Sequence, residues 1–310
     1  MNRPASRDTP VAPLAPPAHG DQLADYLSHL AHTRRLSPLT VENYRRDLRD
    51  LLRVTGGRPL ESLKVHDLRR AVARLHAEGL SGRSLARKLS AWRGMFGWLG
   101  REGVLPCNPA AGLKAPRAPR KLPACLSPDQ AARLLDGEAH GDESLCDQAL
   151  FELIYSSGLR LAEAAGLDPA DVDLREGTVR VTGKGAKTRV VPLGAKAAAA
   201  LEAWLPARER RAAPGETALF LGVRGRRIAH RAVQKRLDAL ALKRGLDDHV
   251  HPHVLRHSFA SHVLQSSGDL RAVQELLGHA SISTTQVYTH LDFQHLARVY
   301  DAAHPRARRK

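Results

Sequence analysis

Six residues in the second half of the chain have side chains that suit the cleavage of a phosphodiester. They are Arg160, Lys184, His253, Arg256, His279 and Tyr288. Cleavage without a metal needs positive charge on the non-bridging phosphate oxygens and a nucleophile in line with the leaving oxygen. Arginine is planar and permanently charged, so it can bind two phosphate oxygens at once. Tyrosine is a candidate nucleophile, although a phenol with its ordinary pKa of about 10 needs a base or electrostatic help.

Local signals place several of these side chains at the ends of expected elements. Arg160 follows Gly158, a glycine that ends a helix and permits close approach of the backbone. Lys184 stands between two glycines at the tip of a predicted hairpin. His253 and Arg256 are three residues apart, which places them on one helical face.

The candidate nucleophile lies in a short helix of its own. Gly278 is a predicted helix C-cap that leaves His279 in a turn. Ser283 and Gln286 form a capping box, and the helix that they begin has Tyr288 in its second turn. Taken singly, each feature has an ordinary alternative, such as a surface arginine or a half-buried tyrosine. The histidine run could equally be a weak metal tract, comprising His249, His251, His253 and His257.

The elements that must hold these residues indicate an α+β protein that is mostly helical. From Asp21 to about Gly103 the pattern predicts four helices, the fourth with an apolar face of Leu85, Leu89, Trp92, Phe96 and Leu99. Further along we expect helices over 128–136 and 142–157 and a small antiparallel sheet. Its strands are residues 178–182 and 188–191, with 218–221 as a candidate third. The predicted organisation is a disordered tail at 1–20, a helical domain at 21–105, a Pro-rich basic linker at 106–126 and a second domain at 127–310.

Composition restricts the class of partner. Lys and Arg outnumber Asp and Glu by 48 − 32 = 16, which favours a nucleic acid or an acidic membrane surface as partner. No apolar run approaches the ~20 residues of a membrane span, and the first residues lack a signal-peptide pattern, so a cytoplasmic protein is expected. The three cysteines form no CxxC pair, and no GxxxxGK[ST] or HExxH motif occurs. We therefore expect no metal and no cofactor.

The order and spacing of the six residues resemble the signature of the tyrosine recombinase (lambda integrase-like) family. The segments GLRLAE, GKGAKTR, HPHVLRHSFASH and LLGHASISTTQVYTH are similar to those of the chromosomal Xer recombinases, and the tail LDFQHLARVYDAAHPRA is most similar to the XerC branch. The resemblance covers about residues 20–305. It implies an N-terminal four-helix core-binding domain, followed by a catalytic domain that cuts and rejoins DNA without metal or ATP.

The resemblance also implies a role for each site residue. Tyr288 would attack the phosphate and form a 3′-phosphotyrosyl bond, while Arg160 and Arg256 clamp the phosphate. His253 would be the base, His279 would position the phosphate or the tyrosine, and Lys184 would be the acid for the leaving 5′ oxygen. Glu163 would be a buried acid that supports the site.

Three further groups of residues belong to this expectation. Basic side chains around the fourth helix and the hairpin would contact DNA, namely Arg83, Arg87, Lys88, Arg93, Lys187 and Arg189. Phe293, Leu296 and Tyr300 form an apolar stripe after the nucleophile, which we expect to pack into a neighbouring protomer; docking on its own domain is the alternative. The expected partners are duplex DNA with a dif-like site, a XerD-like recombinase in a cyclic heterotetramer and an FtsK-like translocase, acting to resolve chromosome dimers before division.

Three alternatives share parts of this pattern. A type IB topoisomerase uses the same chemistry but can act as a monomer, so a docking stripe argues against it. A phage or transposon integrase of the classical kind adds an arm-binding domain, for which only a short Pro-rich tail is present here. A non-enzymatic DNA-binding protein would explain the charge but not six suitable residues in register.

Overall fold

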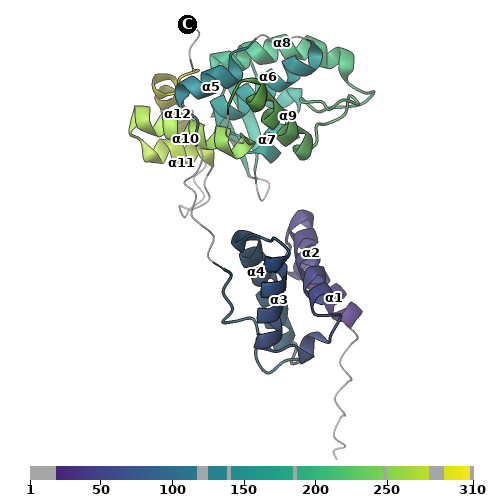
Figure 1. Cartoon of the computed structure of the whole chain (residues 1–310). Helices are drawn as coiled ribbons and strands as arrows, with labels where there is room; N and C mark the ends of the chain where they lie inside the picture. Colours follow the sequence, from purple (N-terminus) through teal and green to yellow (C-terminus); the bar gives the residue numbers. More distant parts are fainter. Residues whose placement is uncertain are drawn as a thin grey trace, which may run out of the picture. The chain divides into compact units, whose positions relative to one another are not determined.

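The computed structural model describes residues 19–116, 125–137, 141–183, 187–246, 250–278 and 290–307. The chain divides into two compact units, Met1–Lys121 and Leu122–Lys310, each with its own hydrophobic core (Figure 1). None of the helices among the described residues combines the length and the apolar composition that a membrane span requires.

The first unit contains the four expected helices. They are α1 (His19–Ser28), which continues into a π-helical turn at His29–Thr33, α2 (Pro38–Val54), α3 (Val65–Ala77) and α4 (Gly82–Arg101). Serine side chains begin two of them: the Oγ of Ser37 accepts a hydrogen bond from the Thr40 N–H, and Ser81 caps α4 in the same way. The predicted apolar face of α4 is confirmed, because all five of its residues are at most 1% exposed.

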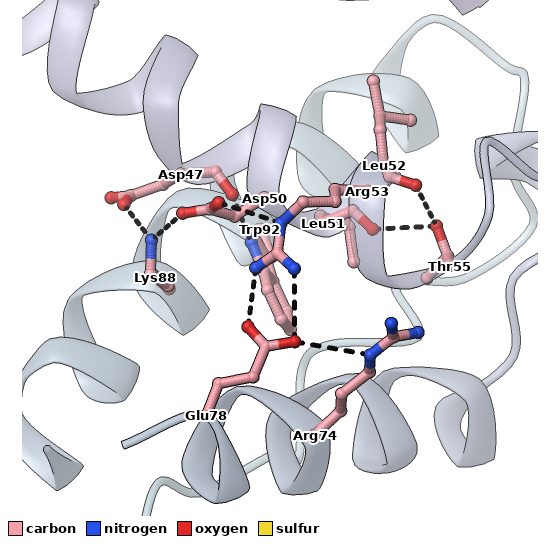
Figure 2. A network of polar contacts seen from close by, with 10 residues as sticks. All are labelled: Asp47, Asp50, Leu51, Leu52, Arg53, Thr55, Arg74, Glu78, Lys88 and Trp92. Carbon is pink, nitrogen blue, oxygen red and sulfur yellow. Dashed lines mark hydrogen bonds and ion pairs between the residues drawn. The ribbon is translucent and has the colours of Figure 1, made fainter. Parts of the chain in front are cut away.

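A polar network ties α2 to α3 and α4 (Figure 2). The Nζ of Lys88 donates to the carboxylates of Asp47, at 3.0 Å, and Asp50, at 2.5 Å. The indole N–H of Trp92 donates to the main-chain carbonyl of Asp47. Arg53 forms a bidentate ion pair with Glu78: its Nη1 donates to Oε1 at 3.2 Å and its Nη2 to Oε2 at 2.8 Å. Since Lys88 and Asp47 are 4% and 1% exposed, this pair belongs to the interior of the unit.

The first unit extends into the segment that the sequence assigned to the linker. Ala110 and Leu113 are 0% and 6% exposed and join the core of this unit, together with Leu105. The side-chain amide of Asn108 donates to the Arg93 carbonyl at 3.0 Å, which fixes this extension on α4. Residues up to Leu113 are therefore packed structure, although the prolines there predict an extended chain.

The second unit surrounds a small sheet with helices. Its helices are α5 (Pro128–Leu135), α6 (Asp142–Ser157), α7 (Leu161–Gly166), α8 (Ala195–Arg211), α9 (His230–Lys243), α10 (Pro252–Ser267), α11 (Leu270–Leu277) and α12 (His290–Ala303). The predicted helices 128–136 and 142–157 are confirmed as α5 and α6. Every residue of α6 from Ala149 to Ser157 is buried, so this helix forms the centre of the unit.

The sheet is antiparallel, in the order β1 (Val172–Asp173), β2 (Thr178–Thr182) and β3 (Thr188–Pro192). The hairpin β2–β3 confirms the two predicted strands, with Val181 opposite Arg189 and Thr182 opposite Thr188. The expectation of a third strand at residues 218–221 is wrong. That run is buried, but it has only an isolated bridge from Leu221 to Arg227, and β1 is the third strand.

Candidate active site

The chain passes from α6 to α7 beside α10, and this brings Arg160 close to Arg256 of α10. Gly158 ends α6 in the left-handed conformation, at φ 60°, and a Cβ atom there would lie 2.4 Å from the Phe259 ring of α10. Only glycine fits both conditions. The Gly158 carbonyl accepts a hydrogen bond from Nη1 of Arg256 at 2.5 Å, and Arg160 follows as the N-cap of α7. The tight packing of α6 against α10 thus sets the separation of the two arginines.

Glu163 is the carboxylate that the arginines of the site share. Its Oε1 accepts from Nη1 of Arg160 at 2.9 Å and from Nη1 of Arg189 at 2.8 Å. Its Oε2 accepts from the backbone N–H of Arg160 at 2.8 Å and from Nη2 of Arg189 at 3.0 Å, and Nη1 of Arg256 lies 3.8 Å away. Burial raises the pKa of Glu163, but the bonds from Arg189 and the Arg160 backbone outweigh it and lower the pKa to about 2. This carboxylate is therefore ionised at neutral pH.

Arg256 is the buried member of the arginine pair. It is 8% exposed, and besides Gly158 it donates from Nη2 to the Leu277 carbonyl at 2.7 Å. Burial lowers the pKa of Arg256 to about 10, and the positive charge of Arg160 acts in the same direction. The group stays charged at neutral pH. Its two carbonyl partners fix the plane of the guanidinium.

Arg160 is the open member of the pair. Its side chain is 39% exposed, and Nη2 reaches the Gly278 carbonyl at a long 3.4 Å. Together, three guanidinium groups surround one carboxylate, so the cluster has a net charge of 3 − 1 = +2. A partly exposed site with that surplus can bind a phosphate diester, which has one negative charge, and stabilise the further charge that develops on its oxygens in a transition state.

The structure brings three expected site residues together, Glu163, Arg160 and Arg256, and adds Arg189 to them. Arg189 was expected to contact DNA, but its side chain is 9% exposed and both Nη atoms face Glu163. His253 lies in the first turn of α10 and is exposed, one turn before Arg256. Three predicted site residues lie outside the described residues, namely Lys184, His279 and Tyr288.

The segments that flank these three residues are described. At the end of the β2–β3 hairpin, the Gly183 N–H donates a hydrogen bond to the Lys187 carbonyl at 2.8 Å. Gly278 ends α11 at φ 62°, as predicted, directly before His279. α12 begins at His290, two residues after Tyr288. The arginine cluster contacts the end of α11 through the carbonyls of Leu277 and Gly278.

The remaining predicted DNA contacts are placed in different ways. Arg83 is exposed and Arg93 half-buried, and both line a hollow of about 430 Å³ with Lys114 in the first unit. Arg87 is exposed and pairs with Asp47. Lys88 is buried in the network of Figure 2, so its ammonium faces carboxylates and not solvent. In the second unit, Lys187 is exposed at the base of the hairpin.

The apolar stripe of α12 is covered by its own unit. Leu296 and Tyr300 are 3% and 1% exposed and belong to the core of the second unit, whereas the side chain of Phe293 lies outside the described part of the chain. α12 packs against α10 and α11 (Figure 1). For these two residues the expectation of burial in a neighbouring protomer is therefore corrected: docking on the same domain already buries them.

A buried anchor beyond α12 was not foreseen from the sequence. Arg306 is 6% exposed; its Nε donates to Glu152 at 2.9 Å and its Nη2 to Asp136 at 2.7 Å. Next to it, His304 stacks on Tyr300, with ring centroids 5.2 Å apart. Glu152 inside the apolar run 149–154 was the available signal, because a buried carboxylate needs a cation.

The geometry of the described residues gives no metal centre. No group of three or more potential ligands lies close enough together among them. Of the histidine run, His251 and His253 have ring centroids 6.1 Å apart. Burial lowers the pKa of His251, and His253 acts in the same direction.

Comparison with protein families gives two matches that together cover most of the chain. Residues 124–295 match the Phage integrase family, and residues 23–103 match the Phage integrase, N-terminal SAM-like domain. Tyrosine recombinase XerC of Pseudomonas aeruginosa is 56% identical over 289 residues, which is 92% of this chain and 95% of that protein. Tyrosine recombinase XerC of Alcanivorax borkumensis is 52% identical over 288 residues, covering 92% and 94%.

Two solved structures have a similar fold. XerH site-specific recombinase bound to palindromic difH substrate, in a post-cleavage complex, is 25% identical with a TM-score of 0.68, over 90% of this chain and 84% of that one. A lambda integrase (75–356) dimer bound to a COC' core site is 19% identical with a TM-score of 0.68, over 87% and 99%. The latter likeness supports the fold alone.

Proposed function

The chain belongs to the phage integrase family as a tyrosine recombinase of the XerC type, and we propose that it resolves chromosome dimers at dif-like sites together with a XerD-like recombinase. The supporting likeness extends over 92% of the chain. The observation that carries the chemistry is the cluster of Arg160, Arg256 and Glu163, which provides a fixed and partly exposed surplus of positive charge without a metal.

In the proposed reaction the phenol oxygen of Tyr288 attacks the scissile phosphorus while the bond to the 5′ oxygen breaks. His253 accepts the phenol proton, and Lys184 gives a proton to the leaving 5′ oxygen. Arg160 and Arg256 bind the non-bridging oxygens, whose charge grows in the transition state. His279 positions the phosphate or the tyrosine. A 3′-phosphotyrosyl bond results, and a 5′ hydroxyl of the partner DNA reverses the step without ATP.

The N-terminal unit serves in this proposal as the core-binding domain, with its packed structure extending to Leu113, and residues 127–310 serve as the catalytic domain. Arg83, Arg87, Arg93 and Lys187 contact the DNA backbone. With a formal net charge of +16, the protein should bind DNA with an affinity that falls steeply with salt, because each phosphate contact releases counterions.

The proposed setting is the cytoplasm before cell division. Two copies of the chain and two of a XerD-like recombinase form a cyclic heterotetramer on paired dif-like sites, and an FtsK-like translocase activates exchange. XerH, solved in a complex with difH DNA, is the related case that supports a dif-like substrate.

A plasmid with two directly repeated dif-like sites tests this proposal. It is incubated with the chain, a XerD-like partner and the translocase, and the products are separated on a gel. We expect two smaller circles only when both recombinases are present. Relaxation of the plasmid by the chain alone, without exchange, would indicate a topoisomerase instead. Exchange on a second plasmid, in which one dif-like site is replaced by an unrelated sequence, would indicate an integrase.

A further inference from the structure

Arg189 contacts Glu163 from the interior of the domain. It lies on β3 opposite Val181, and both Nη atoms donate to Glu163, one to each carboxylate oxygen. Its Nε points to the Leu276 carbonyl at 3.4 Å. All three nitrogens of the guanidinium are thus directed at groups of its own domain, and the side chain is 9% exposed. A phosphate outside the protein has little access to it.

The charges of the cluster show why a third arginine matters. Glu163 orients Arg160 through a side-chain and a backbone bond, but a carboxylate that orients an arginine also cancels its charge. Without Arg189, two phosphate-binding guanidiniums would share one negative charge, and the surplus would fall from +2 to +1. With Arg189 as counter-ion of Glu163, Arg160 and Arg256 keep their full charge for a phosphate.

Arg189 also contacts the end of α11. A Cβ atom on Gly278 would lie 3.0–3.1 Å from Nε, Cδ and Cζ of Arg189, so the arginine and the glycine are in close contact. The next residue is His279. One side chain therefore connects β3, α7 through Glu163 and the end of α11 through Leu276.

We propose that Arg189 is a positioning residue that neutralises Glu163, so that Glu163 can orient Arg160 without reducing the positive charge available to the scissile phosphate. This inference rests on the proposed DNA cleavage, and it assigns Arg189 no contact with DNA. It predicts that substitution slows the chemical step and leaves binding unchanged.

The first test compares Arg189→Gln and Arg189→Lys with the wild type on a nicked suicide substrate, at saturating protein. By analogy with other partners that orient reactive groups, Arg189→Gln should lower the cleavage rate about 10–100-fold. Arg189→Lys keeps the charge and should be faster than Arg189→Gln. A rate for Arg189→Lys as low as that of Arg189→Gln would overturn the counter-ion role.

DNA affinity, measured over a range of salt concentrations, separates this role from a phosphate contact. Loss of a phosphate contact weakens binding and lowers the salt slope by about one unit. We expect neither change for Arg189→Gln. The matched control is Arg180→Gln on the adjacent strand, because Arg180 is 58% exposed and pairs with Asp171 away from the cluster. This control should cleave like the wild type.

The decisive variant is the double substitution Glu163→Gln/Arg189→Gln, which restores the surplus of two positive charges. Compared with Glu163→Gln alone it should lose little further rate, because no negative charge is left for Arg189 to neutralise. A purely structural role for Arg189 would instead give the same loss of rate in the Glu163→Gln background as in the wild type. Melting temperatures of all variants show whether they are folded. If the wild type itself forms no covalent product, the proposed function fails; if only the order of the variants is wrong, this inference fails.

Discussion

One carboxylate with three guanidinium neighbours defines the candidate site at the scale of residues. Glu163 accepts four hydrogen bonds at 2.8–3.0 Å, which uses the usual acceptor capacity of a carboxylate. Arg256 is fixed by two carbonyls, and Arg160 remains the most exposed member. The cluster is therefore assembled by its own hydrogen bonds before any phosphate binds, and a preorganised site of this kind favours the transition state.

Substitution of Arg256 by lysine tests the clamp. Lysine keeps one charge but cannot donate to the Gly158 and Leu277 carbonyls and to a phosphate in one plane. We expect the cleavage rate to fall on the order of 10²–10³-fold, as for the loss of one oxyanion donor. DNA affinity should change little. The rate is measured with the nicked substrate, and cleavage at the wild-type rate would contradict the assignment.

His304 gives the second unit a stability that depends on pH. Burial lowers the pKa of this histidine from its ordinary 6.5 to about 3, and His262 and Arg306 act in the same direction. Between these values the unfolded chain binds a proton that the folded chain does not. This contribution to stability is thus complete above pH 6.5 and decreases as the pH falls toward 3.

The His304→Phe variant measures this contribution, because phenylalanine keeps a ring against Tyr300, Tyr155 and Phe259. The free energy of unfolding is determined in urea between pH 7 and pH 4. We expect a shallower decline than in the wild type. Equal slopes for both proteins would show that His304 does not titrate in this window.

The part of Arg189 in the site could not be predicted from the sequence, and the reason is physical. Local spacing indicated only the helix end before Arg160 and the shared helical face of His253 and Arg256, whereas the grouping of Arg160, Glu163 and Arg256 was implied by the family resemblance. Arg189 looked like a basic residue of an exposed hairpin. Strand alternation could have predicted that Arg189 points into the domain. Arg189 lies on the same face of the strand as the buried Val191, whereas Val190 on the other face is 46% exposed. Only the position of Glu163 shows why an arginine faces inward there.

At the scale of elements, periodicity predicted α4 and α6 but not the third strand. Leu219 and Phe220 are fully buried, and their backbones bond to Leu167 and Ile228 instead of a sheet neighbour. The actual third strand, Val172–Asp173, is too short to have a period. An apolar run therefore predicts burial, whereas strand pairing depends on tertiary contacts that the sequence does not display.

The buried ion pair of Arg306 with Glu152, which fixes the chain after α12 to α6, can be tested by its contribution to stability. Arg306→Ala leaves Glu152, which is 2% exposed, without its cation. Breaking a buried ion pair in this way costs about 3–5 kcal/mol, which urea unfolding of the variant should detect. The control is Arg210→Ala, since Arg210 is 64% exposed in its pair with Asp142, and it should cost about 1 kcal/mol or less. Equal losses in both variants would contradict a buried anchor.

At the scale of the whole molecule, the chain has two separate cores. The buried residues of the first core lie between Tyr26 and Leu113, and those of the second between Leu126 and Ala307. Units with their own cores can fold alone. Residues 1–121 and 122–310, expressed separately, should each give a cooperative unfolding transition by circular dichroism. A fragment without such a transition would show that it depends on the other unit.

In the proposed reaction, Tyr288 forms a covalent bond with DNA in a site charged by Arg160 and Arg256. The most direct measurement incubates the chain, with and without a XerD-like partner, on a nicked suicide substrate with a dif-like site, followed by a denaturing gel. We expect a covalent protein–DNA band that is lost in Tyr288→Phe and kept in Tyr44→Phe, because Tyr44 is a half-buried tyrosine of the first unit. Intact DNA binding without that band, or a band that persists in Tyr288→Phe, would contradict the proposed reaction.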